Sequence, residues 1–291
     1  MGKTTVAAAT AVAAARSGLR VGLIELEGKS GLADLFGREP LGYDEIELAE
    51  GVTGRTITPD EALLEYLRDH GLSRISKRLV SSGALELVAT AVPGIRDILV
   101  LGRVKALERA GTFDLLVLDA PAAGHAITFL LSARGLVDAV SVGPINAQAR
   151  DVLEMLTDEE RCQVLLVTLP EETPVNELVD TAYHLEDRVG VALGPVVVNS
   201  LVPAIAGTEA DPEAAAASAG VSLRPGEAEA LRAAADFRHQ RMALQAEQVD
   251  RLADALPLPQ LHLPQLPVTD LGPDHLDRLA EALLAAIEGM P

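Results

Sequence analysis

The sequence is poor in aromatic residues and cysteine, and it has no long apolar run. Aromatic residues make up 2% of the 291 residues, and Trp is absent. The 48% hydrophobic content therefore comes mainly from Ala, Leu and Val, which suit helices packed closely on a buried sheet. No apolar run reaches the roughly 18 residues of a membrane span, and the alanine-rich start is followed by Arg16 without a signal-peptide cleavage site. We expect a cytoplasmic protein without stable membrane insertion.

Cysteine and basic residues are scarce as well. Cys162 is the only cysteine, which excludes an intrachain disulfide and a metal site built from cysteines. The 24 Lys and Arg residues are outnumbered by 43 Asp and Glu residues, so the formal net charge is −19. This charge opposes binding to nucleic acid and to anionic membranes. We predict no nucleic-acid partner.

Short β-branched runs alternate with helical stretches along the chain. This alternation predicts an α/β fold with a mostly parallel sheet flanked by helices. Strands are predicted at Leu19–Leu26, Phe113–Asp119, Val164–Leu169 and Val191–Asn199, with a weaker strand at Ala139–Val142 and an edge strand at Leu256–Leu263. Helices are predicted at Thr4–Ser17, at Ala147–Leu156 with Asn146 as its N-cap, at Pro174–Val189 and at Asp274–Ile287.

Two segments depart from the alternation. Residues 59–110 predict three successive helices without a strand, which would form a helical insert. Residues 211–255 predict a second helical excursion. The chain has no repeat and no long linker, so we expect residues 1–291 to form a single domain.

A phosphate-binding motif stands at the start of the sequence. Gly2-Lys3-Thr4-Thr5 opens the first predicted helix and matches the end of the G-x-x-x-x-G-K-[ST] pattern of P-loop proteins. Glycine lets backbone amides approach phosphates, while Lys3 and Thr4 suit the lysine cation and the Mg²⁺-binding hydroxyl. Four residues also match by chance, so the motif needs support from further along the chain. We hypothesise that the protein begins further upstream, because the sequence starts within this loop.

A buried aspartate provides that support. The strand predicted at Phe113–Asp119 ends in Asp119, which is followed by Ala-Pro-Ala-Ala-Gly-His and a new helix. An aspartate at the carboxyl end of a buried strand is where a Walker B acid holds the Mg²⁺ hydration shell. The alternative is an aspartate that only caps a helix. Because Lys3 precedes it in the expected order, we interpret Asp119 as the Walker B acid.

Several motifs resemble those of the arsenite-translocating ATPase family, ArsA, which includes the ATPase for guided entry of tail-anchored membrane proteins. Asp119–His125 resembles the family's D-T-A-P-T-G-H switch, and Thr168–Glu172 is similar to its T-x-P-E-E strand end. Val196–Asn199 resembles the V-V-N strand end that contacts adenine, and Leu263–Val268 resembles the C-terminal P-x-L-P motif. The resemblance covers nearly the whole chain in the right order. It implies a dimeric switch ATPase that uses ATP and Mg²⁺.

The resemblance also implies roles for individual residues. Lys3 would contact the phosphates, and Thr5 would lie close to the α-phosphate. Thr4 and Asp119 would hold Mg²⁺, and Asn199 would contact adenine.

One departure from the family concerns the residue that positions the attacking water. Aligning Leu32-Ala33-Asp34 with the family's D-P-A-H-S-L segment places Glu27 at the aspartate that has this role. Glutamate keeps the carboxylate but is one methylene longer. Two interpretations stay open, a catalytic Glu27 and a glutamate in an exposed turn.

Three functions are compatible with these motifs. The first is a switch ATPase that couples the nucleotide to closure of a homodimer, or of a heterodimer with a paralogous ATPase, and to a protein cargo. The second is a regulatory subunit with weak catalysis that pairs with an active paralogue, favoured by Glu27 and by the lack of cysteines for a metalloid. The third is a ParA- or MinD-like positioning ATPase. The acidic composition disfavours it, as does a C-terminal helix, His275–Ile287, whose one basic residue is Arg278.

Overall fold

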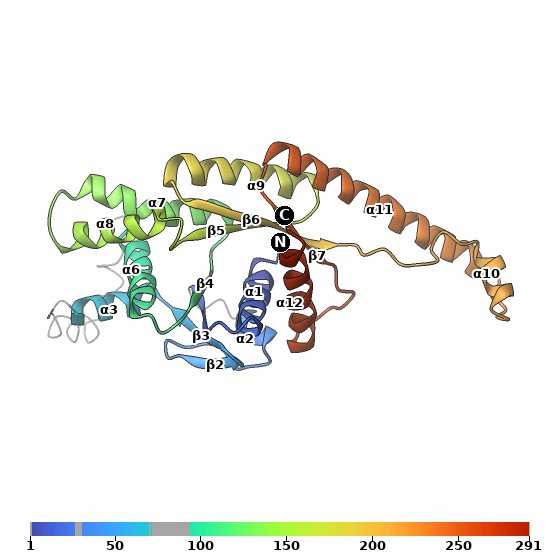
Figure 1. The fold of residues 1–291 in the computed structure, drawn as a ribbon, viewed down its shortest axis with the longest axis horizontal. Coiled ribbons are helices and arrows are strands. Elements are labelled where there is room, and N and C mark those ends of the chain that lie inside the picture. Colours follow the sequence, from blue (N-terminus) through green and yellow to red (C-terminus); the bar gives the residue numbers. More distant parts are fainter. Residues whose placement is uncertain (1, 27–30, 70, 72–93, 291) are drawn as a thin grey trace.

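The computed structural model describes residues 2–26, 31–69, 71 and 94–290, and it arranges helices around two β-sheets (Figure 1). The strands are β1 (Val21–Leu26), β2 (Ile46–Ala49), β3 (Val52–Ile57), β4 (Leu115–Asp119), β5 (Gln163–Thr168), β6 (Ala192–Leu201) and β7 (Gln260–Pro264). The helices are α1 (Lys3–Arg16), α2 (Gly31–Leu35), α3 (Pro59–Asp69), α6 (Ile95–Ala110), α7 (Ala123–Ala139), α8 (Pro144–Thr157), α9 (Glu172–His184), α10 (Pro212–Ser218), α11 (Glu227–Ala255) and α12 (Pro273–Glu288), and a π-helical turn (Leu185–Val189) continues α9.

The strands are mostly parallel, which confirms the predicted α/β class. The first sheet has the order β2-β3-β1-β4, and the second has the order β5-β6-β7. The β2–β3 pair is antiparallel, whereas β1 pairs in parallel with β3 and β4, and β6 pairs in parallel with β5 and β7. The described strands are therefore divided between two sheets. The predicted edge strand near the C-terminus is confirmed, since β7 ends the second sheet.

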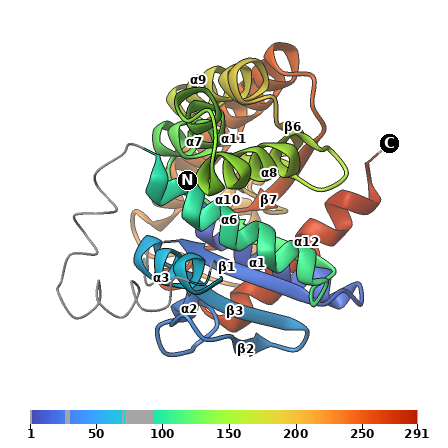
Figure 2. The same ribbon diagram turned by 90° about the vertical axis from the view of Figure 1, so that its left-hand side faces the viewer.

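Helices cover both faces of the first sheet. On one face α1 and α12 pack in a core that also contains Leu23 of β1, Val197 of β6 and Leu263 of β7, so this core joins the two sheets. On the other face α3, α6, α7 and α8 pack against Ile24 and Ile57. Figure 2 shows α6, α7 and α8 on the side toward the viewer, with α1 and α12 behind them. Because both faces are covered, all six residues of β1 are buried.

Two local predictions were wrong, and one element was missed. Ala139–Val142 is not a strand, because α7 continues to Ala139 and Val142 is 80% exposed. Asn146 is not an N-cap, because α8 begins at Pro144 after Gly143 and the buried Asn146 side chain donates a hydrogen bond to the Val140 carbonyl. The β2–β3 hairpin was not predicted.

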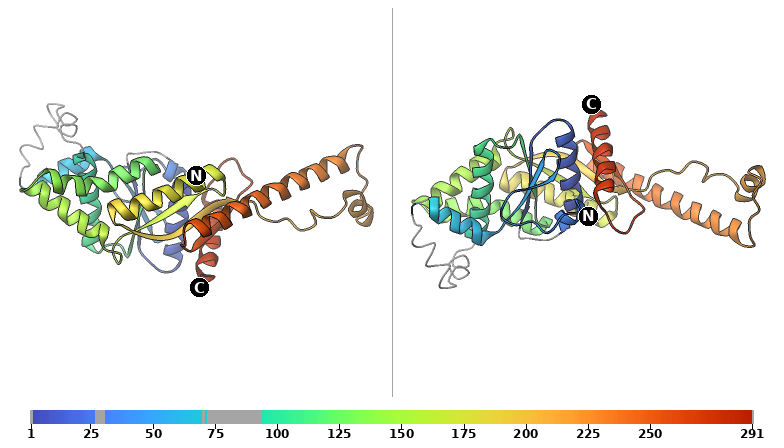
Figure 3. Two further views of the ribbon diagram at one scale, coloured as in Figure 1. Left: turned by 90° about the horizontal axis from the view of Figure 1, so that it is seen from above. Right: turned by 90° about the horizontal axis from the view of Figure 1, so that it is seen from below.

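The two helical segments are present in the described residues. The first contains α3 and α6, and the middle helix expected between them lies outside the described residues. The second contains α10 and the 29-residue α11, which projects away from both sheets (Figures 1 and 3). None of the described helices combines the length and the apolar character needed to cross a bilayer.

Candidate active site

The first element of the site is the N-terminus of α1. Gly2 has a φ of 78°, and its carbonyl accepts the first helical hydrogen bond, from the Val6 amide at 2.9 Å. A Cβ on Gly2 would overlap the side-chain amide of Asn199, so both the backbone conformation and the available space require glycine. The first-turn amides of a helix have no partner within the helix and attract anions. The predicted phosphate-binding residues Lys3, Thr4 and Thr5 follow at this helix end.

The second element is the carboxyl end of β4, where Asp119 lies. The Thr4 hydroxyl Oγ1 donates a hydrogen bond to Asp119 Oδ2 at 2.8 Å, which joins residues 115 positions apart. The structure therefore brings together the two residues that the sequence predicted as Mg²⁺ ligands. Hydroxyl and carboxylate oxygens are the ligand types that Mg²⁺ prefers in proteins.

The third element is the end of β6. Asn199 is 8% exposed and packs beside Gly2, so the predicted adenine contact lies at the start of α1. Ser200 has a φ of 64°, the left-handed region that residues with a side chain rarely adopt. The side chain of Gln245, from α11, holds this backbone. Its Oε1 accepts a hydrogen bond from the Val202 amide at 2.9 Å, and its Nε2 donates one to the Ser200 carbonyl at 3.3 Å.

Comparison with known proteins supports the family that the motifs indicate. Residues 1–141 match the family model of the anion-transporting ATPase, ArsA. The chain is 32% identical over 97% of its length to the ATPase BagA of Mycobacterium tuberculosis, of which it covers 89%. The chain belongs to the ArsA family of anion-transporting ATPases. It is also 24% identical over 95% of its length to a putative arsenical pump-driving ATPase of Halobacterium salinarum, of which it covers 42%.

Sequence reasoning missed a buried carboxylate in this ArsA-family site. Glu25, in β1, is 2% exposed, and it is the register partner of Thr56 on β3 and of Asp119 on β4. Thr56 Oγ1 donates a hydrogen bond to Glu25 Oε2 at 3.0 Å. Burial raises the pKa of the Glu25 carboxyl, and Asp119 raises it further, whereas Thr56 and the Leu32 amide lower it. An acidic residue inside the apolar run Val21–Leu26 was the signal that could have identified it.

Glu27, the candidate for positioning water in this family member, lies outside the described residues. The chain is described again from Gly31, the first residue of α2. A Cβ built on Gly31 would lie 4.0 Å from Thr4 Cγ2. The start of α2 therefore lies beside the phosphate-binding residues.

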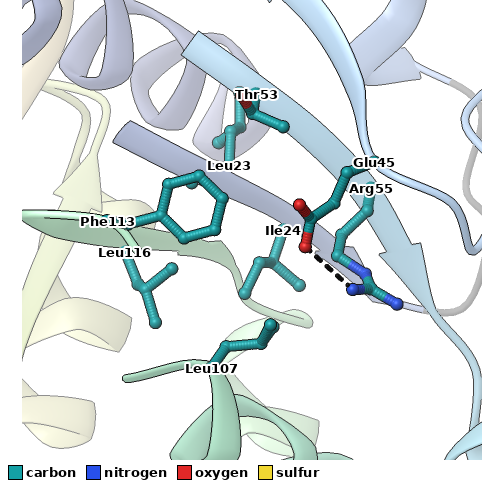
Figure 4. A pocket seen from close by; sticks show the side chains of 9 residues that line it. Leu23, Ile24, Glu45, Thr53, Arg55, Leu107, Phe113 and Leu116 are labelled. Carbon is teal, nitrogen blue, oxygen red and sulfur yellow. Dashed lines mark hydrogen bonds and ion pairs between the residues drawn. The ribbon is translucent and has the colours of Figure 1, made fainter. Parts of the chain in front are cut away.

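A separate hollow lies between β1, β3 and β4 (Figure 4). Most of its lining is apolar, and the one ion pair within it joins Arg55 to Glu45 at 3.1 Å. The Arg55 guanidinium also stacks over the Tyr43 ring, 4.4 Å from its centroid. The lining includes Gly22 and Phe113, near the amino ends of the strands, and none of the predicted site residues. This hollow is therefore distinct from the ArsA-type site at the carboxyl ends.

Proposed function

We propose that this ArsA-family chain binds and hydrolyses ATP in a Mg²⁺-dependent reaction at the N-terminus of α1. The observation that carries the proposal is the 2.8 Å hydrogen bond between Thr4 and Asp119, which holds a hydroxyl and a carboxylate within reach of one cation. Thr4 and Asp119 would hold Mg²⁺, which would supply positive charge to the triphosphate.

The remaining site residues bind and orient the nucleotide in this proposal. Amides of the first turn of α1 and the Lys3 ammonium bind phosphate oxygens, with Thr5 close to the α-phosphate. Asn199 presents a donor and an acceptor on one amide, which matches the edge of adenine. Glu27 is proposed to orient the attacking water.

We further propose that the protein works as a dimeric switch, either as a homodimer or with a paralogous ATPase, and that it acts on a protein cargo. The segment after Asp119 contains Gly124, at the start of α7, where a Cβ would meet nothing within 4 Å. We propose that this segment moves when the γ-phosphate leaves. Helix α11 exposes three large apolar side chains, those of Leu231, Phe237 and Leu244. Phe237 and Leu244, seven residues apart, lie on the same face of α11, and their exposure there supports an interface with a second protein.

The test is ATP binding by Thr4→Ala, measured by calorimetry with Mg²⁺ and with EDTA. Loss of a cation ligand should weaken Mg²⁺-dependent binding by about tenfold or more, since each 1.4 kcal/mol is tenfold. Thr10→Ala is the matched control, because it makes the same change further along α1. Binding of Mg²⁺-ATP by Thr4→Ala with unchanged affinity would contradict the proposed site.

Turnover separates the catalytic and regulatory possibilities. Phosphate release is measured for the chain alone and with a paralogous ATPase. Turnover by the chain alone supports the ATPase proposal. Tight ATP binding with turnover only in the mixture would instead assign the chain a regulatory role.

A further inference from the structure

Glu25 is a buried acidic residue to which the proposed ATP-binding site assigns no role. It is 2% exposed, in the middle of the first sheet. Oε2 accepts the hydrogen bond from Thr56, but Oε1 is buried and has no hydrogen-bond partner within the described part of the chain. Buried polar atoms are nearly always hydrogen-bonded, so an unpartnered carboxylate oxygen calls for a further partner, such as a water or a cation.

The strand register places Glu25 on the same face of the sheet as the proposed cation site. Glu25 pairs with Thr56 on one side and with Asp119 on the other, and neighbouring strands lie about 4.8 Å apart. Register partners point to the same face of a sheet, and Leu23, two residues before Glu25, packs in the core with α1. Asp119 meets Thr4 of α1 on that same face. Glu25, Asp119 and Thr4 therefore lie on one face of the sheet, with Glu25 and Asp119 opposite each other on adjacent strands.

Two neighbouring carboxylates, one of them buried, are unfavourable without a positive charge. Glu25 and Asp119 are register partners on adjacent strands, so two negative charges there repel each other at close range. A divalent cation reverses this interaction, because both carboxylates then attract the same ion. Burial strengthens that attraction, since water screens it less.

We propose that Glu25 is a cation-positioning residue that adds a second carboxylate, through Oε1, to the divalent-cation site formed by Thr4 and Asp119. This inference rests on the proposed Mg²⁺-dependent binding of ATP and goes beyond it, because it assigns a role to a residue outside the sequence motifs. The alternative is a structural glutamate that serves only to accept the Thr56 hydrogen bond. A glutamine would perform that structural role equally well, which provides the test.

The experiment compares Glu25→Gln with the wild-type chain by titrating Mg²⁺ against a fluorescent ATP analogue and by measuring binding of the analogue in EDTA. Loss of the charge should raise the Mg²⁺ concentration for half-maximal binding by about tenfold, the effect of one lost charge interaction. Binding in EDTA should stay equal or become tighter, because a negative charge near the triphosphate has been removed. Glu47→Gln is the matched control, since it removes the same charge from an exposed position of β2 in the same sheet.

Glu25→Asp keeps the charge, so it distinguishes the loss of a cation ligand from a general loss of folding. Under the proposal, Glu25→Asp needs less Mg²⁺ than Glu25→Gln for half-maximal binding. Unchanged Mg²⁺ dependence in Glu25→Gln, or equal weakening in both variants with and without Mg²⁺, would overturn the inference. If the wild-type chain itself shows no Mg²⁺-dependent binding, the proposed function fails instead.

Discussion

The side chain of Gln245 should determine how the end of β6 presents Asn199 to a nucleotide. Gln245 is 4% exposed, and it makes hydrogen bonds to the Val202 amide and to the Ser200 carbonyl. Gln245→Leu keeps a similar volume but removes both bonds. Ser200 also has a φ of 64°, a conformation that surrounding contacts must hold in place.

The size of the effect follows from these two bonds. A typical hydrogen bond contributes about 1 kcal/mol net, and Ser200 and Val202 are half-buried, so water compensates part of the loss. We therefore expect Gln245→Leu to destabilise the protein by about 2 kcal/mol. For a chain of 291 residues that loss corresponds to a melting temperature lower by about 3 °C, because the unfolding entropy grows with chain length. ATP affinity should fall as well, because the turn that Gln245 no longer holds directly follows Asn199, the residue proposed to contact adenine.

The assay combines thermal unfolding with titration of a fluorescent ATP analogue. Gln240→Leu is the matched control, because Gln240 is exposed on the same helix. It should leave both measurements unchanged. The reasoning is refuted if Gln245→Leu melts with the wild-type chain and binds the analogue with wild-type affinity.

Two further predictions concern the phosphate-binding turn and an ion pair. Gly2→Ala should abolish ATP binding, because its Cβ would overlap the Asn199 side chain. Gly18 also has a positive φ but has open space around it, so Gly18→Ala should lower the melting temperature and retain ATP binding. Calorimetry of both variants measures the two effects. Arg161 donates two hydrogen bonds to Glu108, at 3.0 and 2.9 Å, and these hold the pKa of Glu108 below its ordinary value of 4.5. The ion pair therefore stabilises the fold above pH 4.5, and this stabilisation is lost progressively as the pH falls below that value and Glu108 is protonated. A Glu108→Gln variant should lose less stability than the wild-type chain on acidification, as measured by melting curves at several pH values.

The sequence by itself determined the central parallel strands. β1 is an almost continuous apolar run whose six residues are all buried, because helices cover both of its faces. The half-buried β4 and the buried centre of β6 are apolar runs as well. The residues expected at the phosphates and at Mg²⁺ could also be chosen from sequence. Their chemistry requires a glycine, a lysine and a hydroxyl in consecutive positions at a helix start, and an acid at a strand end.

Tertiary structure alone decided which polar residues could be buried. Arg55 in β3 is 6% exposed, because an ion pair with Glu45 and a cation–π contact with the Tyr43 ring stabilise its charge. None of these three residues is adjacent to another in the sequence. For this reason β3 does not show the apolar run typical of a buried strand. Glu25 and Gln245 were missed for the same reason. Their environment is formed by β3, β4 and the turn after β6, which lie far from them in the chain and contact them only in the folded protein.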